Sequence, residues 1–403
     1  MSLIKSRIGG KMGLEEIKER LKESGIDGWL FYDFHNRDRV AYRILGLDES
    51  TFTSRRWFYY VPVEGEPVKI VSGVEQTRLD VLPGEKLVYR KWSELEDSLR
   101  KVLKGARKVA MQYSPMNNIP YISIVDAGTV ELVRSFGVEV VSSANLVQIF
   151  EALIDQGSFE THRFAGIKIQ QIKDEAFALI GEILKAGKKI TEYEVQQFIV
   201  RRFAEEGLTD DGDHPIVGVN EHPADPHFAP TQENSYVIKY GDKILIDLWA
   251  RLDEPGSIYY DITWCGFAGD DPPEDYERLF RLVCEARDKA VDFIKRKLAS
   301  QEKLFGYEVD DVARGVIEEA GFGEYFVHRT GHSIGTEVHG NGVNIDNFET
   351  KDDREIVPGL CFSIEPGIYI PGQMGVRTEI DVYINATREV VIVGDIQTEL
   401  IKL

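Results

Sequence analysis

The sequence predicts an α+β protein of two domains, and three observations support this prediction. The chain has 403 residues, of which 43% are hydrophobic, and this is enough for two domains of ordinary size. The first third alternates short strand-like and helix-like segments, which is the order of a small α/β domain. The rest of the chain shows two helices followed by strands twice in succession, an order that suggests an internal duplication.

The N-terminal third begins with a predicted helix from Leu14 to Ser24, because apolar residues recur at helical spacing and Gly25 follows as a terminating glycine. The segments predicted after it are strands at 28–32, 55–62 and 67–71, a helix at 94–103, a strand at 108–112 and a helix at 122–136. We place the domain boundary within residues 142–155. The two predicted domains are therefore residues 1–150 and residues 155–403.

The larger C-terminal domain begins with a long amphipathic helix from Phe159 to Leu184. A capping box at Thr191–Glu194 opens the second helix, which runs to about Glu206. The first group of predicted strands is 215–220, 235–239, 244–249 and 258–264, the last two joined by a turn at 253–256. Asp271 is the expected N-cap of a long helix that has Pro272 at its first position and ends near Leu298. A helix at 307–320 and further strands complete the chain.

Four carboxylates lie within strongly apolar predicted strands: Asp247, Asp261, Glu365 and Glu379. Burying an ionised carboxylate is unfavourable unless its charge is compensated. Side chains that point to solvent from half-exposed strands would explain one or two such residues. Four of them require shared positive charge, and these segments contain too little lysine and arginine to provide it. Bound divalent metal is the simplest explanation.

Six of the eight histidines fall between His214 and His339. Glycines on both sides of His332 allow a close approach of the backbone and fix the direction of its imidazole. A lone histidine in this setting is more often structural, but imidazole is the usual nitrogen ligand that completes a carboxylate-rich metal site. His339 lies seven residues further on, where it could face the same cavity and hold a substrate carbonyl or carboxylate.

The bulk composition excludes several classes of partner. A formal net charge of -20 argues against nucleic acid or an anionic membrane as the main partner. The three cysteines form no CxxC pair, which favours a reducing cytoplasm over a disulfide or metal-thiolate framework. The N-terminal MSLIKSRIGGKMG lacks an apolar export segment, and no apolar run is long enough to span a membrane. We therefore expect a cytoplasmic protein.

The order of the motifs resembles a known family. Asp247 and Asp261 are followed by GHSIG and VHG, then by IEPG, then by GVRTE, and this order is similar to the five-ligand signature of the pita-bread metallopeptidases. That family comprises Xaa-Pro aminopeptidases, prolidases and methionine aminopeptidases, with creatinase as a metal-free cousin. The resemblance covers Phe159 to the C-terminus and implies a pita-bread fold for residues 155–403. The N-terminal domain resembles the creatinase-like α/β domain of prolidases and Xaa-Pro aminopeptidases.

The resemblance implies a metal site with two divalent ions. It makes Asp247 a bidentate ligand of one metal and makes Asp261 and Glu379 bridges between both. His332 and Glu365 would complete the two coordination shells. Oxygen ligands with one histidine suit Mn²⁺, Co²⁺ or Zn²⁺, and the sequence does not choose among them. Two such ions hold water as hydroxide near neutral pH and polarise the carbonyl that it attacks.

The resemblance also implies roles in catalysis. Glu365 would carry a proton from the attacking water to the leaving proline nitrogen. His227 and His339 resemble the two histidines that contact the substrate in this family. Arg377, two residues before Glu379, resembles the arginine that orients the bridging glutamate.

The resemblance implies a metal-dependent exopeptidase that hydrolyses the Xaa-Pro bond at the N-terminus of peptides or in dipeptides, by a metal-bridged hydroxide. The resemblance further implies a homodimer that acts on proline-containing peptides. A methionine aminopeptidase is disfavoured, because the members of that group lack an N-terminal domain of this kind. Two alternative functions are possible on the same fold. One is a creatinase-like hydrolase that acts on another amide, and the other is a non-catalytic binding protein. Both predict lost ligands, and all five are present.

Two features depart from the family pattern. Asp247 and Asp261 are fourteen residues apart, a few more than usual, with residues 252–256 as the apparent insertion. A longer hairpin connection would leave both strand registers intact. Trp264 stands where the resembling enzymes have arginine, so we expect that it replaces a cation near the site and alters which end of the substrate is recognised.

Overall fold

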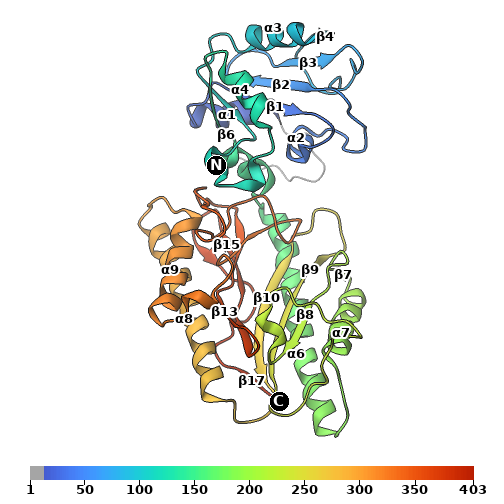
Figure 1. Cartoon of the computed structure of the whole chain (residues 1–403), viewed down its shortest axis with the longest axis vertical. Coiled ribbons are helices and arrows are strands. Elements are labelled where there is room, and N and C mark those ends of the chain that lie inside the picture. The colour runs from blue at the N-terminus through green and yellow to red at the C-terminus, as the bar shows by residue number, and fades with distance from the viewer. Residues whose placement is uncertain (1–12) are drawn as a thin grey trace. The chain divides into compact units, whose positions relative to one another are not determined.

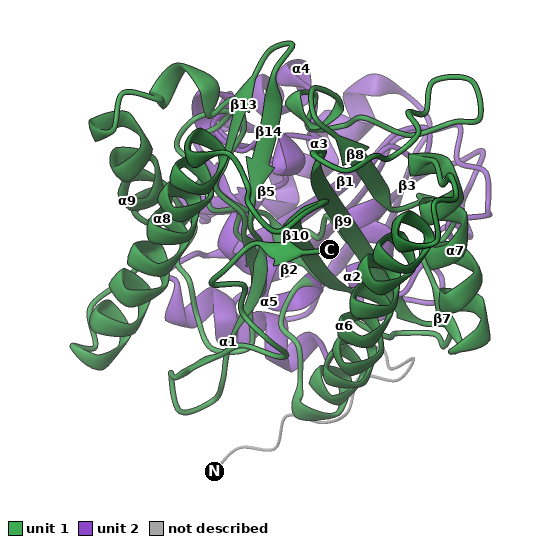
Figure 2. Ribbon diagram, turned by 90° about the horizontal axis from the view of Figure 1, so that it is seen from below, with its two compact units in different colours: residues 1–6, 152–403 green, residues 7–151 purple. Residues whose placement is uncertain are grey.

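The computed structural model describes residues 13–403, which divide into two compact units, one that ends at Glu151 and one that begins at Ala152 (Figure 2). Residues 1–12, in which we expect no export segment, lie outside the described range. Among the described residues, no helix is both long enough and apolar enough to cross a membrane.

The N-terminal unit is built on a mixed sheet with helices on both faces. Within residues 13–151 the sheet has six strands in the order β4-β3-β2-β1-β5-β6, in which only the pairs β1–β2 and β2–β3 are antiparallel. Its elements are α1 Leu14–Glu23, β1 Gly28–Asp33, α2 Arg39–Leu45, β2 Trp57–Pro62, β3 Val68–Ser72, β4 Glu85–Tyr89, α3 Trp92–Val102, β5 Lys108–Met111, α4 Ala127–Arg134, β6 Glu139–Ser142 and α5 Ala144–Glu151.

Both faces of this sheet are buried, since alternate side chains of β1 enter two different cores. Trp29 and Phe31 pack into one core, and Leu30 and Tyr32 into the other. The structure confirms the predicted helix near residue 14 and the predicted strands at 55–62 and 67–71, which pair as the antiparallel hairpin of β2 and β3. The sequence pattern did not predict α2, β4, β6 and α5. These elements have four to eight residues, too few for a clear periodic pattern.

The C-terminal unit encloses its strands between two pairs of helices (Figure 1). The helices are α6 Gln156–Lys185, α7 Glu192–Glu205, α8 Glu274–Ala299 and α9 Gly306–Glu319. The strands are β7 Leu208–Thr209, β8 Ile216–Val219, β9 Lys243–Leu252, β10 Tyr260–Phe267, β11 Ser333–Ile334, β12 Cys361–Ile364, β13 Gly367–Ile370, β14 Met374–Arg377, β15 Ile380–Ile384, β16 Val390–Val391 and β17 Ile401–Lys402. One core forms under α6 and α7, and a second under α8 and α9.

The strands of the two halves share their surroundings, because the core under α8 and α9 also contains Leu245 of β9 and Phe267 of β10. β8 pairs with β9, which lies between β7 and β10, and β17 from the chain end completes this sheet. The second half contributes the sheet β11-β12-β15-β16 and the hairpin β13-β14. The predicted order of two helices followed by strands, twice in succession, is confirmed.

Two local predictions in this unit are wrong. Residues 235–239 form no strand but a single antiparallel bridge, between Val237 and Thr191, and the backbone N–H of Tyr236 is bonded to the side chain of Glu192. Helix α8 begins at Glu274, so Pro272 and Pro273 both precede it and Asp271 is not its N-cap. The capping box at Thr191 is present, with Glu194 as its partner.

The hairpin of β9 and β10 brings two of the predicted ligands to one face. Eight consecutive residue pairs join the strands, from Lys243 opposite Phe267 to Ala250 opposite Tyr260. Asp247 lies opposite Thr263, two residues from Asp261, so period-2 geometry directs all three side chains to the same side. The longer connection lies beyond the last pair and leaves the register intact, as we expected.

A buried histidine fastens helix α6 to the start of β10. The His162 imidazole is 1% exposed, donates from Nδ1 to the Tyr259 carbonyl oxygen at 2.6 Å and stacks on Phe159. Burial lowers its pKa to about 4. The ring is therefore neutral at pH 7, whereas an unfolded histidine has a pKa near 6.5.

We predict that protonation of this histidine in the unfolded chain destabilises the protein as the pH falls from about 6.5 to 4, because the native ring does not take up the proton. The contribution to the free energy of unfolding is about 3 kcal/mol. Urea unfolding across this pH range should show a flatter pH dependence for His162→Phe than for the wild type. The exposed His35 provides the control, since His35→Asn should leave the wild-type slope. Parallel curves for the wild type and His162→Phe would contradict the prediction.

Candidate metal centre

The five predicted ligands come from both halves of the C-terminal unit. Asp247 and Asp261 lie on β9 and β10 in the first half. The other three lie at the ends of short strands in the second half: His332 precedes β11, Glu365 follows β12, and Glu379 lies between β14 and β15. The site therefore requires both halves to be folded.

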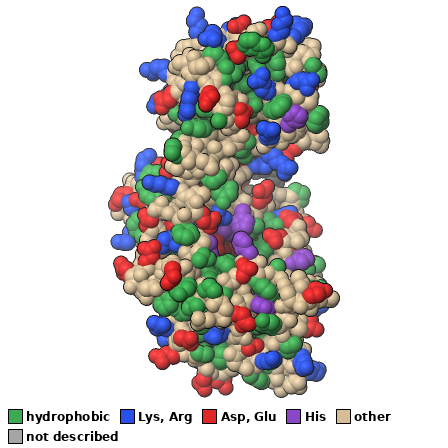
Figure 3. Space-filling view, viewed as in Figure 1, with side chains coloured by type: hydrophobic (Ala, Val, Ile, Leu, Met, Phe, Trp, Pro, Cys, Tyr) green, Lys and Arg blue, Asp and Glu red, His purple; other side chains and the backbone are tan. Residues whose placement is uncertain are grey.

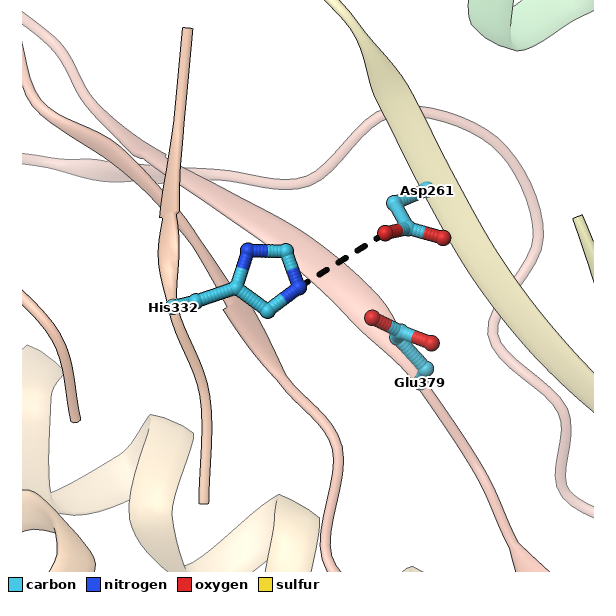
Figure 4. Close-up of side chains that lie close together, drawn as sticks. All are labelled: Asp261, His332 and Glu379. Atoms are coloured by element: carbon cyan, nitrogen blue, oxygen red, sulfur yellow. Dashed lines mark ion pairs between the residues drawn. The ribbon is translucent and has the colours of Figure 1, made fainter. Parts of the chain in front are cut away.

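The structure brings these side chains together. Asp261, His332 and Glu379 each place one potential ligand atom within 4.8 Å of the other two (Figure 4). The His332 Nε2 atom lies 3.7 Å from Asp261 Oδ2 and 3.4 Å from Glu365 Oε1. Asp247 joins the group through the hydroxyl of Thr263, whose Oγ1 lies 3.1 Å from Asp247 Oδ1 and 2.7 Å from Glu379 Oε2.

All five residues are buried, and each residue is at most 9% exposed. Two carboxylate oxygens, Asp261 Oδ1 and Glu379 Oε1, have no hydrogen-bond partner within residues 13–403. Leaving a buried charged oxygen without a partner is strongly unfavourable. These two atoms are therefore positioned to bind a cation.

The electrostatics of the cluster also indicate that it binds a cation. Burial raises the pKa of Asp261 well above its usual value, and the nearby carboxylates of Glu379 and Asp247 raise it further. Burial likewise raises the pKa of Glu379, with Glu365 and Asp247 as additional causes. So many carboxylates in one buried space favour the neutral form unless positive charge is supplied.

The His332 imidazole is suited to metal binding. Burial lowers its pKa well below the usual value, so the ring is neutral at pH 7. Nδ1 lies 3.4 Å from the carbonyl oxygen of Ser333, which places the ring proton there and leaves a lone pair on Nε2, the atom that faces Asp261 and Glu365. Hard oxygen donors with one neutral imidazole are a donor set for divalent ions, so the residues fit the metal centre that the sequence implies.

Arg377 is the cation inside the cluster. Its guanidinium forms an ion pair with Asp247 through Nη2 and donates from Nε to Thr263 Oγ1 at 2.9 Å. Its contact with Glu379 runs through the Thr263 hydroxyl, whereas its contact with Asp247 is direct. The side chain is 5% exposed, so this charge is poorly screened by solvent.

Two further residues hold Arg377 in place, and the sequence motifs did not indicate them. Tyr369 OH accepts from Arg377 Nη1 at 3.2 Å and donates to His328 Nε2 at 2.7 Å. The His328 Nδ1 atom in turn donates to the carbonyl oxygen of Arg329 at 2.6 Å. Thr263 was also missed, although its position two residues after Asp261 on the same strand is a period-2 signal that could have identified it.

The two histidines expected to contact substrate are both exposed. The His339 ring lies 4.3 Å from the His332 ring in an edge-to-face arrangement. His227 is near enough to both Asp247 and His339 to interact with each of them electrostatically. Histidine side chains gather on the face of this unit shown in Figure 3.

Trp264 lies on the opposite face of β10 from the metal centre. Its ring packs in the core under α6 and α7, and Lys173 from α6 places Nζ 3.4 Å from the ring centroid. The expectation that Trp264 stands near the site is therefore wrong. Side chains alternate between the two faces of a strand, so Asp261 and Thr263 face the metal centre while Trp264 faces the helices.

Fold and site together define a peptidase-like metal protein, and comparison with known proteins gives the family. Residues 166–386 match metallopeptidase family M24, and the chain belongs to this family. The chain is 28% identical over 363 residues to a probable dipeptidase PepE from Mycobacterium tuberculosis, an alignment that covers 89% of this chain and 88% of the relative. It is 32% identical over 207 residues to an Xaa-Pro dipeptidase from Lactobacillus helveticus, covering 51% of each.

The solved structure of dipeptidase PepE from Mycobacterium ulcerans has the same fold. It superposes with a TM-score of 0.66, covers 96% of each chain and is 23% identical in sequence. The predicted α+β class, with a pita-bread fold in the larger domain and a smaller α/β domain before it, is confirmed.

We predict that the packing of Trp264 contributes stability and takes no part in metal binding. Trp264→Ala should lower the free energy of unfolding by about 3–5 kcal/mol, because it leaves a cavity beside Lys173. The folded fraction should bind as much metal as the wild type, which elemental analysis measures. Trp264→Phe, which retains most of the packing, serves if the alanine variant does not fold. Altered metal content in stably folded Trp264→Phe would contradict this account.

We predict that removing one charge from the cluster has opposite effects on the metal-free and metal-loaded protein. Metal-free Asp261→Asn should be at least as stable as the metal-free wild type, because it lacks one uncompensated buried charge. Saturating Mn²⁺ should stabilise the wild type by about 3 kcal/mol at a hundredfold excess over Kd and the variant much less. Thermal unfolding with and without Mn²⁺ measures both effects.

The control for this prediction is Asp395→Asn, which removes an exposed carboxylate from the same unit. It should respond to Mn²⁺ as the wild type does. An equal gain in stability for Asp261→Asn and the wild type would show that the metal binds elsewhere.

Proposed function

We propose that this protein is an exopeptidase that holds two divalent metal ions and hydrolyses the Xaa-Pro bond at the N-terminus of dipeptides or short peptides. The observation that carries the proposal is the convergence of four buried carboxylates and one neutral imidazole around a single arginine. The dipeptidase names of the relatives support this class of substrate.

The ligands in this proposal are Asp247, Asp261, His332, Glu365 and Glu379. The four proposed carboxylate ligands and Arg377 leave an excess of three negative charges when all are ionised, and the buried carboxylate of Asp381 beside Asp261 adds a fourth, which is more than one divalent ion balances. This excess supports two ions over one. Mn²⁺, Co²⁺ and Zn²⁺ all suit the donors. Such ions supply water activated for attack near neutral pH and polarise the carbonyl of the scissile bond.

The protein's own side chains would protonate the leaving nitrogen and position the substrate. The nitrogen of proline in an Xaa-Pro bond must gain a proton as the C–N bond breaks, as any amide nitrogen does, so a side chain is needed to deliver that proton. Glu365 is the proposed carrier of that proton. Ser363 donates from Oγ to Glu365 Oε1 at 3.0 Å and holds the carboxylate at the edge of the cluster.

Substrate positioning is assigned to the exposed histidines. His339 is in contact with His332, and both His339 and His227 can donate to a carbonyl or carboxylate of a bound peptide. Arg377 has a different task. It is fully engaged with Asp247, Thr263 and Tyr369, so it fixes the ligands and does not reach for substrate.

We further propose that the protein acts as a homodimer in the cytoplasm and has neither nucleic acid nor a membrane as a partner. The net charge of -20 opposes binding to polyanions. All three cysteines are free and buried, which is compatible with a reducing compartment. Light scattering at working concentration tests the dimer, and a monodisperse monomer would rule it out.

The test of the proposed activity is hydrolysis of Ala-Pro and of Ala-Pro-Ala after chelation, with and without added Mn²⁺ or Co²⁺. We expect metal-dependent release of alanine from at least one substrate, and the ratio of the two rates separates a dipeptidase from an aminopeptidase. Glu365→Gln should lower kcat by roughly 10²–10⁴-fold because it cannot carry a proton. Turnover of neither peptide by protein with two bound metals would contradict the proposal.

A further inference from the structure

A compact cluster of four side chains fixes the segment that carries His227. We call this cluster the loop clamp, and it consists of Glu192, His222, Phe228 and Tyr236. Glu192 is the first residue of α7, and the other three lie in the connection between β8 and β9. The clamp lies outside the metal centre, and none of its members is a proposed ligand.

The carboxylate of Glu192 is the anchor of the clamp. The residue is 0% exposed, and its oxygens accept hydrogen bonds from Val219 N at 2.7 Å, from Tyr236 N at 2.7 Å and from His222 Nδ1 at 2.9 Å. Three donors compensate for the burial of one carboxylate. This one group therefore ties together the end of β8 and both ends of the segment that carries His227.

The His222 ring forms the centre of an aromatic stack. Its centroid lies 4.1 Å from the Phe228 ring with an interplanar angle of 27°, and 3.9 Å from the Tyr236 ring with an angle of 26°. Such pairs contribute roughly 0.5–1.5 kcal/mol each beyond their buried area. The Tyr236 hydroxyl also donates to Glu221 Oε1 at 3.0 Å. Because Phe228 directly follows His227, the stack restricts where the His227 backbone lies.

The turn that carries His222 is wedged between two strands. It is a short 3₁₀ turn, His222–Ala224, and Pro223 contacts glycines on both sides. A Cβ on Gly218 of β8 would lie 2.9 Å from the Pro223 ring, and a Cβ on Gly375 of β14 would lie 1.8 Å from the Pro223 carbonyl oxygen. β14 is the strand that ends at Arg377, so the clamp rests on the same framework as the metal centre.

We propose that His222 is a positioning residue, which holds His227 at the metal centre through the stack with Phe228 and the hydrogen bond to Glu192. This inference rests on the proposed function, in which His227 binds the substrate. The segment from Asp225 to Ser235 belongs to no strand or helix, so its position depends on such side-chain contacts. His222 acts on binding through His227 and takes no part in the chemistry.

The test is a double-mutant cycle on the Mn²⁺-loaded protein with Ala-Pro as substrate. His222→Ala should raise KM about tenfold and leave kcat and metal content near wild type. His227→Ala should raise KM at least as much, and the double variant should be no worse than His227→Ala, because the two residues act as one unit. His222→Phe retains an aromatic ring in the stack and should recover most of the lost affinity.

The matched control is Tyr240→Ala, which removes an exposed aromatic ring further along the same connection and outside the clamp. It should keep the wild-type KM. Additive effects of His222→Ala and His227→Ala, or a wild-type KM in His222→Ala, would overturn the proposal.

A second readout does not depend on activity. Hydrogen exchange measured by mass spectrometry should be faster across residues 223–235 in His222→Ala than in the wild type, and unchanged there in Tyr240→Ala. If the wild type hydrolyses neither Ala-Pro nor Ala-Pro-Ala, the proposed function fails, and the exchange data still decide whether the clamp holds the segment. Equal exchange rates in His222→Ala and the wild type would refute the clamp.

Discussion

Four buried carboxylates share one buried arginine, and this imbalance of charge is the constraint on which the C-terminal unit depends. Arg377 binds Asp247 and Thr263, and the hydroxyl of Thr263 extends the contact to Glu379. Asp261 Oδ1 and Glu379 Oε1 remain without partners among the described residues. The unit is therefore incomplete in its electrostatics until cations bind, which makes metal binding part of its stability as well as of its proposed chemistry.

The fold meets this constraint by separating the two faces of its strands. On β10, Asp261 and Thr263 face the metal centre, whereas Trp264 faces α6 and contacts Lys173. The helices thus bury the apolar faces, and the inner faces collect polar groups from both halves of the unit. A similar use of buried carboxylates occurs at Glu192, which has three hydrogen-bond donors and no need of a metal.

Much of the fold and the cluster could be predicted from the sequence, because both depend on local patterns. Long amphipathic helices and carboxylates within apolar runs are visible in a single chain, and the motif order identified the five candidate ligands. The supporting residues could not be predicted, because they depend on contacts between distant segments: Tyr369 with His328, and Glu192 with His222. Trp264 shows a second limit of prediction from sequence. The motif comparison identified which family position this residue occupies, but it did not show on which face of the strand the ring lies and therefore what the ring contacts.

The most direct test of the central claim is a crystal structure of the protein grown with Mn²⁺, with anomalous diffraction measured at the manganese absorption edge. The account predicts two anomalous peaks among the side chains of Asp247, Asp261, His332, Glu365 and Glu379, with Arg377 still paired to Asp247. Peaks at other places in the chain, or none at this cluster in crystals saturated with Mn²⁺, would contradict it, because the four carboxylates would then be held without the cations that their burial requires.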